Sequence, residues 1–207
     1  MKTTYSGHQY ALQPNLLHDI KAEAPNEVLV ADITYIAIAG SSAYLFLITD
    51  AFSRMIVGYH LSDSLAHQGA IEALNMALEI VPEPEGVIHH SDRGVQYCCH
   101  GFIDEIRKWN LKASMTDADH CAQNALAECI NGILKSEFYI NAEFQSLRQA
   151  SNAIEDAVFA YNHLRVHGSL RGRTPAEVHY GHDGTLELWA KELVSFTLPV
   201  PLELRHV

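Results

Sequence analysis

The sequence is short of cysteine, of basic residues and of long apolar runs, and each shortage narrows the class of protein. Its 4 cysteines show no paired spacing, which argues against a disulfide framework and fits a reducing compartment. No apolar run approaches the roughly 18 residues of a membrane span, and the opening MKTTY lacks the apolar core of a signal peptide. We therefore expect a cytoplasmic protein with no membrane partner.

Basic residues are outnumbered, since 14 Lys and Arg stand against 25 Asp and Glu, for a formal net charge of −11. Non-specific binding of nucleic acid scales with the number of phosphates that Lys and Arg neutralise. Binding by overall charge is therefore excluded, and any DNA contact must be local or supplied by another segment. The composition is otherwise that of an ordinary globular protein, 48% hydrophobic and 19% charged, and 207 residues suffice for one domain with its own core.

From residue 28 the chain alternates between short apolar segments and amphipathic ones. The expected strands are 28–36, 43–49, 55–61, 87–91 and 111–115. The expected helices are 66–80 with Ser64 as its cap, 100–109, one around Glu128, and 146–164. A three-stranded antiparallel meander, followed by helices and strands in alternation, predicts an α/β protein of the ribonuclease H-like fold. Its five-stranded mixed sheet would be flanked by helices.

Three carboxylates occur in segments that this fold would bring together. Asp32 lies inside the first strand, Asp92 follows the fourth, and Glu128 lies on a later helix. In such a sheet the first and fourth strands are neighbours, so the three side chains could meet at one point. Hard divalent cations prefer oxygen ligands of this kind, and two such ions would support an in-line phosphoryl displacement. Without metal the carboxylates repel one another, so we expect a loose, partly protonated site.

The helix around Glu128, with the sequence NALAECINGILK, has two different sides. At 100° per residue, Asn124, Asn131 and Lys135 fall on the side of Glu128. The predicted apolar side consists of Leu126, Cys129, Ile130 and Ile133. A solvated helix face is one interpretation of the polar side. The clustering around Glu128 favours DNA contacts by Lys135 and the two asparagines, and Arg93, beside Asp92, is a further candidate.

Histidines and cysteines between residues 89 and 121 suggest zinc as an alternative metal. They lack the repeated C-x₂-C or H-x₃-H pairs of structural zinc sites, so we favour magnesium over zinc. His90 could still lie near the metals, because it is two residues from Asp92.

Several motifs in one order carry a family resemblance. They are DITYI (32–36), DAFSRMIVG (50–58), HHSDRGVQY (89–97), NALAE with NGILK (124–135), and YNHLRVH with Thr174-Pro175. With 35 residues between Asp92 and Glu128, the chain resembles, from about residue 3 to 180, the catalytic core of OrfB-type insertion-sequence transposases in the retroviral-integrase superfamily.

The resemblance implies a role for each carboxylate. Asp32, Asp92 and Glu128 would be a DDE triad that holds two Mg²⁺ (or Mn²⁺) ions, with Asp32 bridging both, Asp92 binding one and Glu128 the other. The implied reaction is cleavage of the element's DNA ends followed by strand transfer into target DNA. Synapsis of two ends implies at least a homodimer during the reaction, in the bacterial cytoplasm and on the nucleoid when bound to DNA.

The resemblance also sets the expected domain division and its alternatives. We expect an extended lead-in (1–25), an integrase/transposase catalytic core (26–180) and a C-terminal tail of unknown role (181–207). Members of this family carry a basic helix-turn-helix ahead of the core, so this chain would be a core-only fragment, either excised or catalytically inactive. Two other functions stay open: a metal-dependent nuclease that cuts without joining, and a non-catalytic DNA-binding or interaction module.

Overall fold

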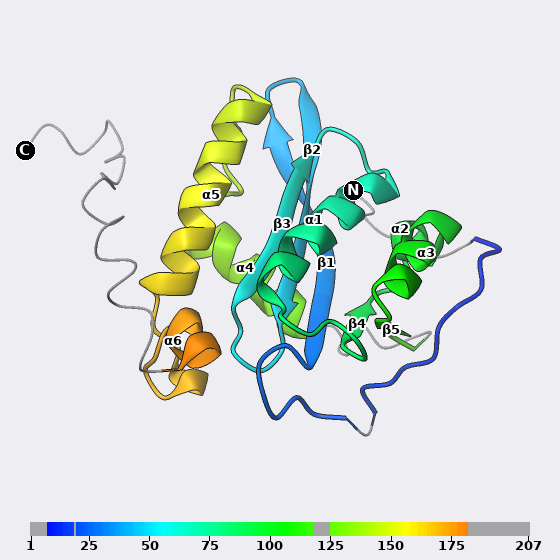
Figure 1. Cartoon of the computed structure of the whole chain (residues 1–207). Coiled ribbons are helices and arrows are strands. Elements are labelled where there is room, and N and C mark those ends of the chain that lie inside the picture. Colours follow the sequence, from blue (N-terminus) through cyan, green and yellow to red (C-terminus); the bar gives the residue numbers. More distant parts are fainter. Residues whose placement is uncertain (1–7, 19, 118–124, 182–207) are drawn as a thin grey trace, which may run out of the picture.

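A five-stranded sheet lies at the centre of the computed structural model, which describes residues 8–18, 20–117 and 125–181 (Figure 1). The strands are β1 (Val28–Ile38), β2 (Ser41–Asp50), β3 (Ile56–Ser62), β4 (Ile88–Ser91) and β5 (Lys112–Met115). Their order is β3-β2-β1-β4-β5, antiparallel from β1 to β3 and parallel from β1 through β4 to β5. The predicted mixed sheet is confirmed, including the adjacency of its first and fourth strands.

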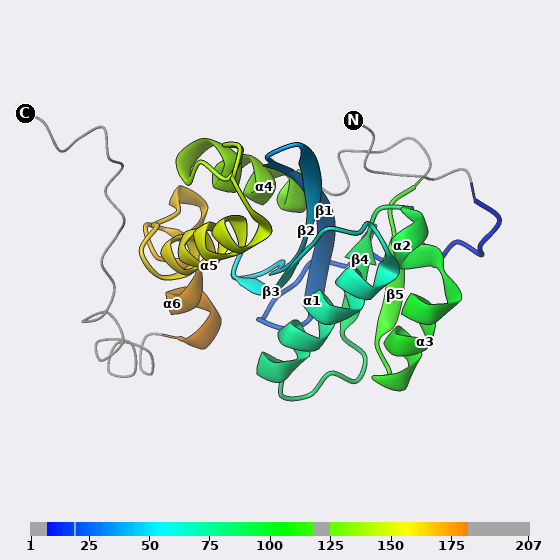
Figure 2. The ribbon, with the colours of Figure 1, turned by 90° about the horizontal axis from the view of Figure 1, so that it is seen from above.

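Helices cover both faces of this sheet. They are α1 (His67–Ile80), α2 (Val95–Cys98), α3 (His100–Lys108), α4 (Ala125–Glu137), α5 (Leu147–His163), the 3-10 turn η2 (Gly168–Leu170) and α6 (Pro175–Tyr180). Seen from above, α1 and α3 lie on one side of the sheet and α4 and α5 on the other (Figure 2). The result is the three-layered, ribonuclease H-like arrangement that the order of elements predicted. No helix in the described ranges is long and apolar enough to cross a bilayer.

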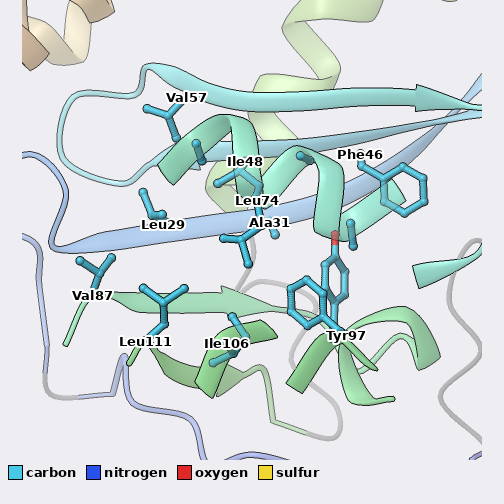
Figure 3. Packing of buried hydrophobic residues seen from close by; sticks show 14 of the residues in the cluster. Leu29, Ala31, Phe46, Ile48, Val57, Leu74, Val87, Tyr97, Ile106 and Leu111 are labelled. Atoms are coloured by element: carbon cyan, nitrogen blue, oxygen red, sulfur yellow. The ribbon is translucent and has the colours of Figure 1, made fainter. Parts of the chain in front are cut away.

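The side-chain alternation of β1 divides the core into two clusters. Leu29 and Ala31 pack with Leu74 of α1 on one face (Figure 3), whereas Ile36 packs against α4 and α5 on the other. Because successive side chains of a strand point to opposite faces, Asp32 belongs to the face that α4 covers. The central strand therefore presents one carboxylate on a face that is otherwise apolar except for Thr34.

One glycine sets the distance between α1 and the sheet. A Cβ at Gly58 of β3 would collide with the carbonyl oxygen of Ala73, in the middle of α1. The helix therefore rests directly on the strand, and any larger residue at this position would push the two apart.

Two details of the helix ends differ from the prediction. Ser64 does not cap α1, because the helix begins after Ala66 and the Ser64 hydroxyl instead accepts a hydrogen bond from the Ala66 N–H within the preceding turn. The α6 helix was not predicted, although its start carries a complete capping box in which Thr174 and Glu177 each accept a backbone hydrogen bond from the other. That signal is readable in the sequence.

The α4 helix forms where predicted but buries a different side. Its buried residues are Ala127, Ile130, Asn131 and Leu134. Cys129 is exposed, and Leu126 and Ile133 are only partly buried, so the predicted apolar side is wrong by part of a turn. The physical reason is that the sheet beneath α4 carries Asp32 as well as apolar side chains, and a polar asparagine meets it there.

Candidate active site

Asp32 occupies the middle of the central strand and is held by one side chain of α4. The Asn131 amide nitrogen donates a hydrogen bond to an oxygen of Asp32 over 2.7 Å, across 99 residues of sequence. Asn131 is only 6% exposed, and its own Oδ1 is buried without a hydrogen-bond partner in the described part of the chain. The contact was missed by helix-face reasoning because it depends on how α4 lies on the sheet.

Asp92 reaches the same place from the neighbouring strand. Val30 of β1 pairs with His90 of the parallel strand β4, so Asp32 and Asp92 each stand two residues beyond one paired position. The Gly94 N–H donates a hydrogen bond to Asp92 Oδ1 over 2.8 Å. A Cβ at Gly94 would lie only 2.9 Å from that oxygen, so glycine lets the loop close around the carboxylate. The loop thereby fixes the direction of Asp92.

Glu128 completes the group from the first turn of α4. It is exposed and lies one turn ahead of Asn131 on the same helix. Burial, the charge of Asp92 and, to a smaller extent, the charge of Glu128 raise the pKa of Asp32 to about 6, against hydrogen bonds from Ile33 and Asn131 that lower it. The three carboxylates are therefore close enough to interact electrostatically.

The chemistry of these donors suits a hard divalent cation. The group offers three carboxylates and the unpaired, buried amide oxygen of Asn131, all of them oxygen ligands of the kind that Mg²⁺ and Mn²⁺ accept. A cation would also offset the repulsion that raises the pKa of Asp32. Within the described ranges, no three His, Cys, Asp or Glu side chains lie close enough together to hold a metal ion as they stand. The arrangement is thus an open, oxygen-lined group rather than a preformed cage.

The residues predicted to contact DNA have different surroundings. Lys135 borders a surface hollow together with Tyr35 and Asn141. The Arg93 guanidinium donates to the Thr116 carbonyl over 2.6 Å, which holds it at the end of β5. Asn124 lies outside the described residues. Asn131, as shown above, is engaged by Asp32.

The histidines near Asp92 lie in the protein core. His89 is fully buried against the rings of Tyr97 and Phe102, and burial together with the charge of His90 lowers its pKa to about 3. Burial lowers the pKa of His90 to about 4, and its Nδ1 lies 2.8 Å from the Ser114 hydroxyl of β5. Both imidazoles are therefore neutral at pH 7, and the hydrogen-bond partner of His90 Nδ1 lies on β5 rather than at Asp92.

A ribonuclease H-like sheet with carboxylates on its two adjacent central strands and on a following helix defines a polynucleotidyl transferase core. Two family models, both described as an integrase core domain, match residues 22–121 and 110–175. The chain belongs to this integrase core family, and within it to the insertion-sequence transposases.

Three relatives illustrate the match. The chain is 37% identical over 176 residues to the insertion element IS600 uncharacterized 31 kDa protein of Shigella sonnei, which covers 84% of this chain and 65% of that protein. It is 33% identical to an uncharacterized transposase-like protein of Haemophilus influenzae, and the match covers 83% of this chain and 80% of that protein. It is 32% identical to the transposase InsF for insertion sequence IS3A of Escherichia coli, and this match covers 84% of this chain and 61% of that protein. The chain thus spans a little under two thirds of the first relative's length.

Solved structures agree on the fold. A simian T-cell lymphotropic virus intasome in complex with the PP2A regulatory subunit B56 gamma contains a chain that matches with a TM-score of 0.68 and 21% identity, covering 84% of this chain and 60% of that one. The HTLV-2 integrase catalytic core domain in complex with magnesium matches with a TM-score of 0.62 and 21% identity, covering 77% of this chain and 99% of that one.

Proposed function

We propose that this chain is the catalytic core of an insertion-sequence transposase, which cleaves the DNA ends of its element and joins them to target DNA. Asp32, Asp92 and Glu128 would hold two Mg²⁺ or Mn²⁺ ions. The observation that carries the proposal is the environment of Asp32, a carboxylate on the central strand with one side-chain amide donor and two like charges around it. Such a group lacks the positive charge that a bound cation would supply.

The protein's own residues orient two of the three carboxylates. Asn131 fixes one oxygen of Asp32 through its amide, and the Gly94 N–H fixes one oxygen of Asp92. Bound metal would supply Lewis-acid activation of a water or 3′-hydroxyl and stabilisation of the leaving oxygen. Holding the ligands in place before DNA arrives reduces the reorganisation needed during the reaction.

DNA and a second copy of the chain are the proposed partners. Lys135, two turns beyond Glu128, would contact a phosphate near the cleaved end, and Arg93 and Asn124 are further candidates. The structural neighbours include a chain of an intasome and an integrase catalytic core in trimeric and dimeric forms. By analogy we propose that two or more copies assemble when two DNA ends are held together.

Calorimetric titration with Mn²⁺ tests the metal site without knowledge of the DNA substrate. The parent chain should bind Mn²⁺, and Asp32→Asn and Glu128→Gln should each weaken that binding. Asp104→Asn is a matched control, because Asp104 is an exposed carboxylate of α3 paired with Arg107. Identical curves for the parent and both site variants would overturn the proposed site.

Strand transfer separates a transposase from a nuclease on the same fold. With Mg²⁺ and DNA carrying the element's ends, the parent should produce joined products, and Glu128→Gln should produce none while keeping its fold by circular dichroism. Cleaved products without any joined ones would favour the nuclease. Equal joining by Glu128→Gln would refute the assignment.

A further inference from the structure

Residues 8–18, named here the strap, run in extended form beside the edge strand β5 (the dark blue segment in Figure 1). They contain no helix or strand of their own. The Met115 N–H donates to the Pro14 carbonyl over 3.3 Å, and the Leu16 N–H donates to the Ser114 hydroxyl over 2.9 Å. The strap is thus held by residues about 100 positions away, which is why its sequence shows no periodicity.

One connection leads from the strap to the residue two positions before Asp92. The Ser114 hydroxyl accepts a hydrogen bond from the Leu16 N–H and also lies 2.8 Å from Nδ1 of His90. Ser114 is 1% exposed and His90 is fully buried, so the connection is shielded from water. A displacement of the strap would therefore remove a hydrogen bond that the buried Ser114 hydroxyl accepts, which costs free energy and frees the residue that His90 contacts.

A second connection leads to the residue directly after Asp92. The Asp117 carboxylate lies 3.2 Å from the Asn15 amide, 2.7 Å from Nε2 of His18 and 4.0 Å from an Arg93 nitrogen. The first residue of the strap, His8, places its Nε2 3.0 Å from the Arg93 carbonyl oxygen. The strap therefore contacts the Arg93 main chain directly and reaches its side chain by way of Asp117, while the Thr116 carbonyl binds the guanidinium at shorter range.

We propose that the strap positions Asp92 for metal binding, with Ser114 and Asp117 as the positioning residues through which it acts. Asp92 lies between two residues, His90 and Arg93, that are both tied to the strap. The inference rests on the proposed role of Asp92 as a metal ligand.

The test uses strap variants that do not touch the carboxylates themselves. The double variant Asn15→Ala/His18→Ala removes two partners of Asp117 from the strap side, and Asp117→Asn removes the charge from the other side. The single variant His18→Gln keeps a donor near the same position, so it should behave like the parent. Asp104→Asn, which removes an ion pair on α3, is the control. Exposed ion pairs add little stability, so all variants should melt near the parent's temperature.

Hydrogen exchange followed by mass spectrometry gives the metal-independent readout. The Gly94 N–H is bonded to Asp92, so its exchange reports on the position of that carboxylate. Peptides covering residues 90–96 should exchange several-fold faster in the double variant and in Asp117→Asn than in the parent, and unchanged exchange would overturn the proposal. Mn²⁺ affinity should fall by on the order of tenfold in the same variants, as is typical when a ligand's supporting partner is lost.

The two proposals can fail separately. A parent chain that binds no Mn²⁺ would overturn the metal site, while the exchange data would still decide whether the strap holds the Asp92 loop. If the Asp92 loop exchanges faster in the strap variants but their Mn²⁺ affinity equals that of the parent, the strap orders the loop without positioning Asp92 for metal. That result would overturn the proposal.

Discussion

Asp32 and Asp50 lie on neighbouring strands, β1 and β2, yet their environments are opposite. Asp50 is fully buried and accepts hydrogen bonds from the Ser53 N–H, the Ser53 hydroxyl and the Asn26 N–H, at 2.7, 2.6 and 2.7 Å, with His179 of α6 at 3.7 Å. Burial alone would raise the pKa of Asp50, but its interactions with His179, Ser53 and Asn26 lower it overall. Asp32 has one side-chain donor and two acidic neighbours, and its pKa is raised to about 6.

The difference teaches how to separate a structural carboxylate from a functional one. Asp50 has its negative charge satisfied by the protein, and the contacts it makes join the β2–β3 turn to α6. Asp32 has no positive charge beside it to compensate its own at the centre of the sheet, which costs free energy and is typical of a functional site. The sequence patterns predicted Asp32 as a metal ligand and gave Asp50 no such role, and the structure adds the physical difference between the two carboxylates.

The largest effect is expected from neutralising Asp32, which tests whether its carboxylate is functional. Asp32→Asn should reduce strand transfer about a thousandfold, because a catalytic metal supplies several kcal/mol of transition-state stabilisation. The free energy of unfolding should stay the same or rise, since the substitution removes repulsion from Asp92 and Glu128 while the side-chain oxygen can still accept from Asn131. Joining assays and urea unfolding measure the two effects. A variant that loses stability and activity together would show that Asp32 is structural.

Neutralising Asp50 should have the reverse outcome. Asp50→Asn places an amide N–H₂ where hydrogen-bond donors already converge, so we expect a loss of about 3 kcal/mol in the free energy of unfolding. Mn²⁺ affinity, measured under conditions where the variant is folded, should match the parent. The exposed control Asp104→Asn should change stability by less than about 0.5 kcal/mol. Parent-like stability of Asp50→Asn would remove the basis for calling this carboxylate structural.

The strands could be predicted because they depend on local patterns, and their order because the succession of elements is that of a ribonuclease H-like fold. Apolar runs bounded by turns identified all five strands, and Asp32 and Asp92 follow from their places in β1 and after β4. The Asn131–Asp32 contact and the strap could not be predicted, since each joins residues about 100 positions apart through an orientation that packing decides. The α6 capping box was a local signal that could have been found.

Asn131 offers a finer test, because among the described residues it is the one side chain that donates a hydrogen bond to Asp32. Asn131→Ala should weaken Mn²⁺ binding by on the order of tenfold, as expected when the partner that orients a ligand is lost. Stability should change by less than about 1 kcal/mol, because the substitution also removes a buried oxygen that has no partner. Ser53→Ala, which removes a donor from Asp50, should leave Mn²⁺ binding unchanged in calorimetry and lower the free energy of unfolding in urea. Equal changes in Mn²⁺ affinity and in stability for the two variants would contradict the distinction between Asp32 as functional and Asp50 as structural.

The smallest expected effect is the acid dependence of stability at Asp50. Its pKa in the folded protein lies below the ordinary value of 3.8, so the folded state favours the ionised carboxylate. The resulting stabilisation is complete above that ordinary value and is lost as pH falls through the lower folded-state pKa. The difference in unfolding free energy between the parent and Asp50→Asn should therefore be full at about pH 5 and shrink as pH approaches about 3. Urea unfolding at closely spaced pH values measures it, and Asp104→Asn corrects for the general effect of removing one acidic group. A difference that grows on acidification would mean that the contacts of Asp50 favour its protonated form, and the contrast with Asp32 would then disappear.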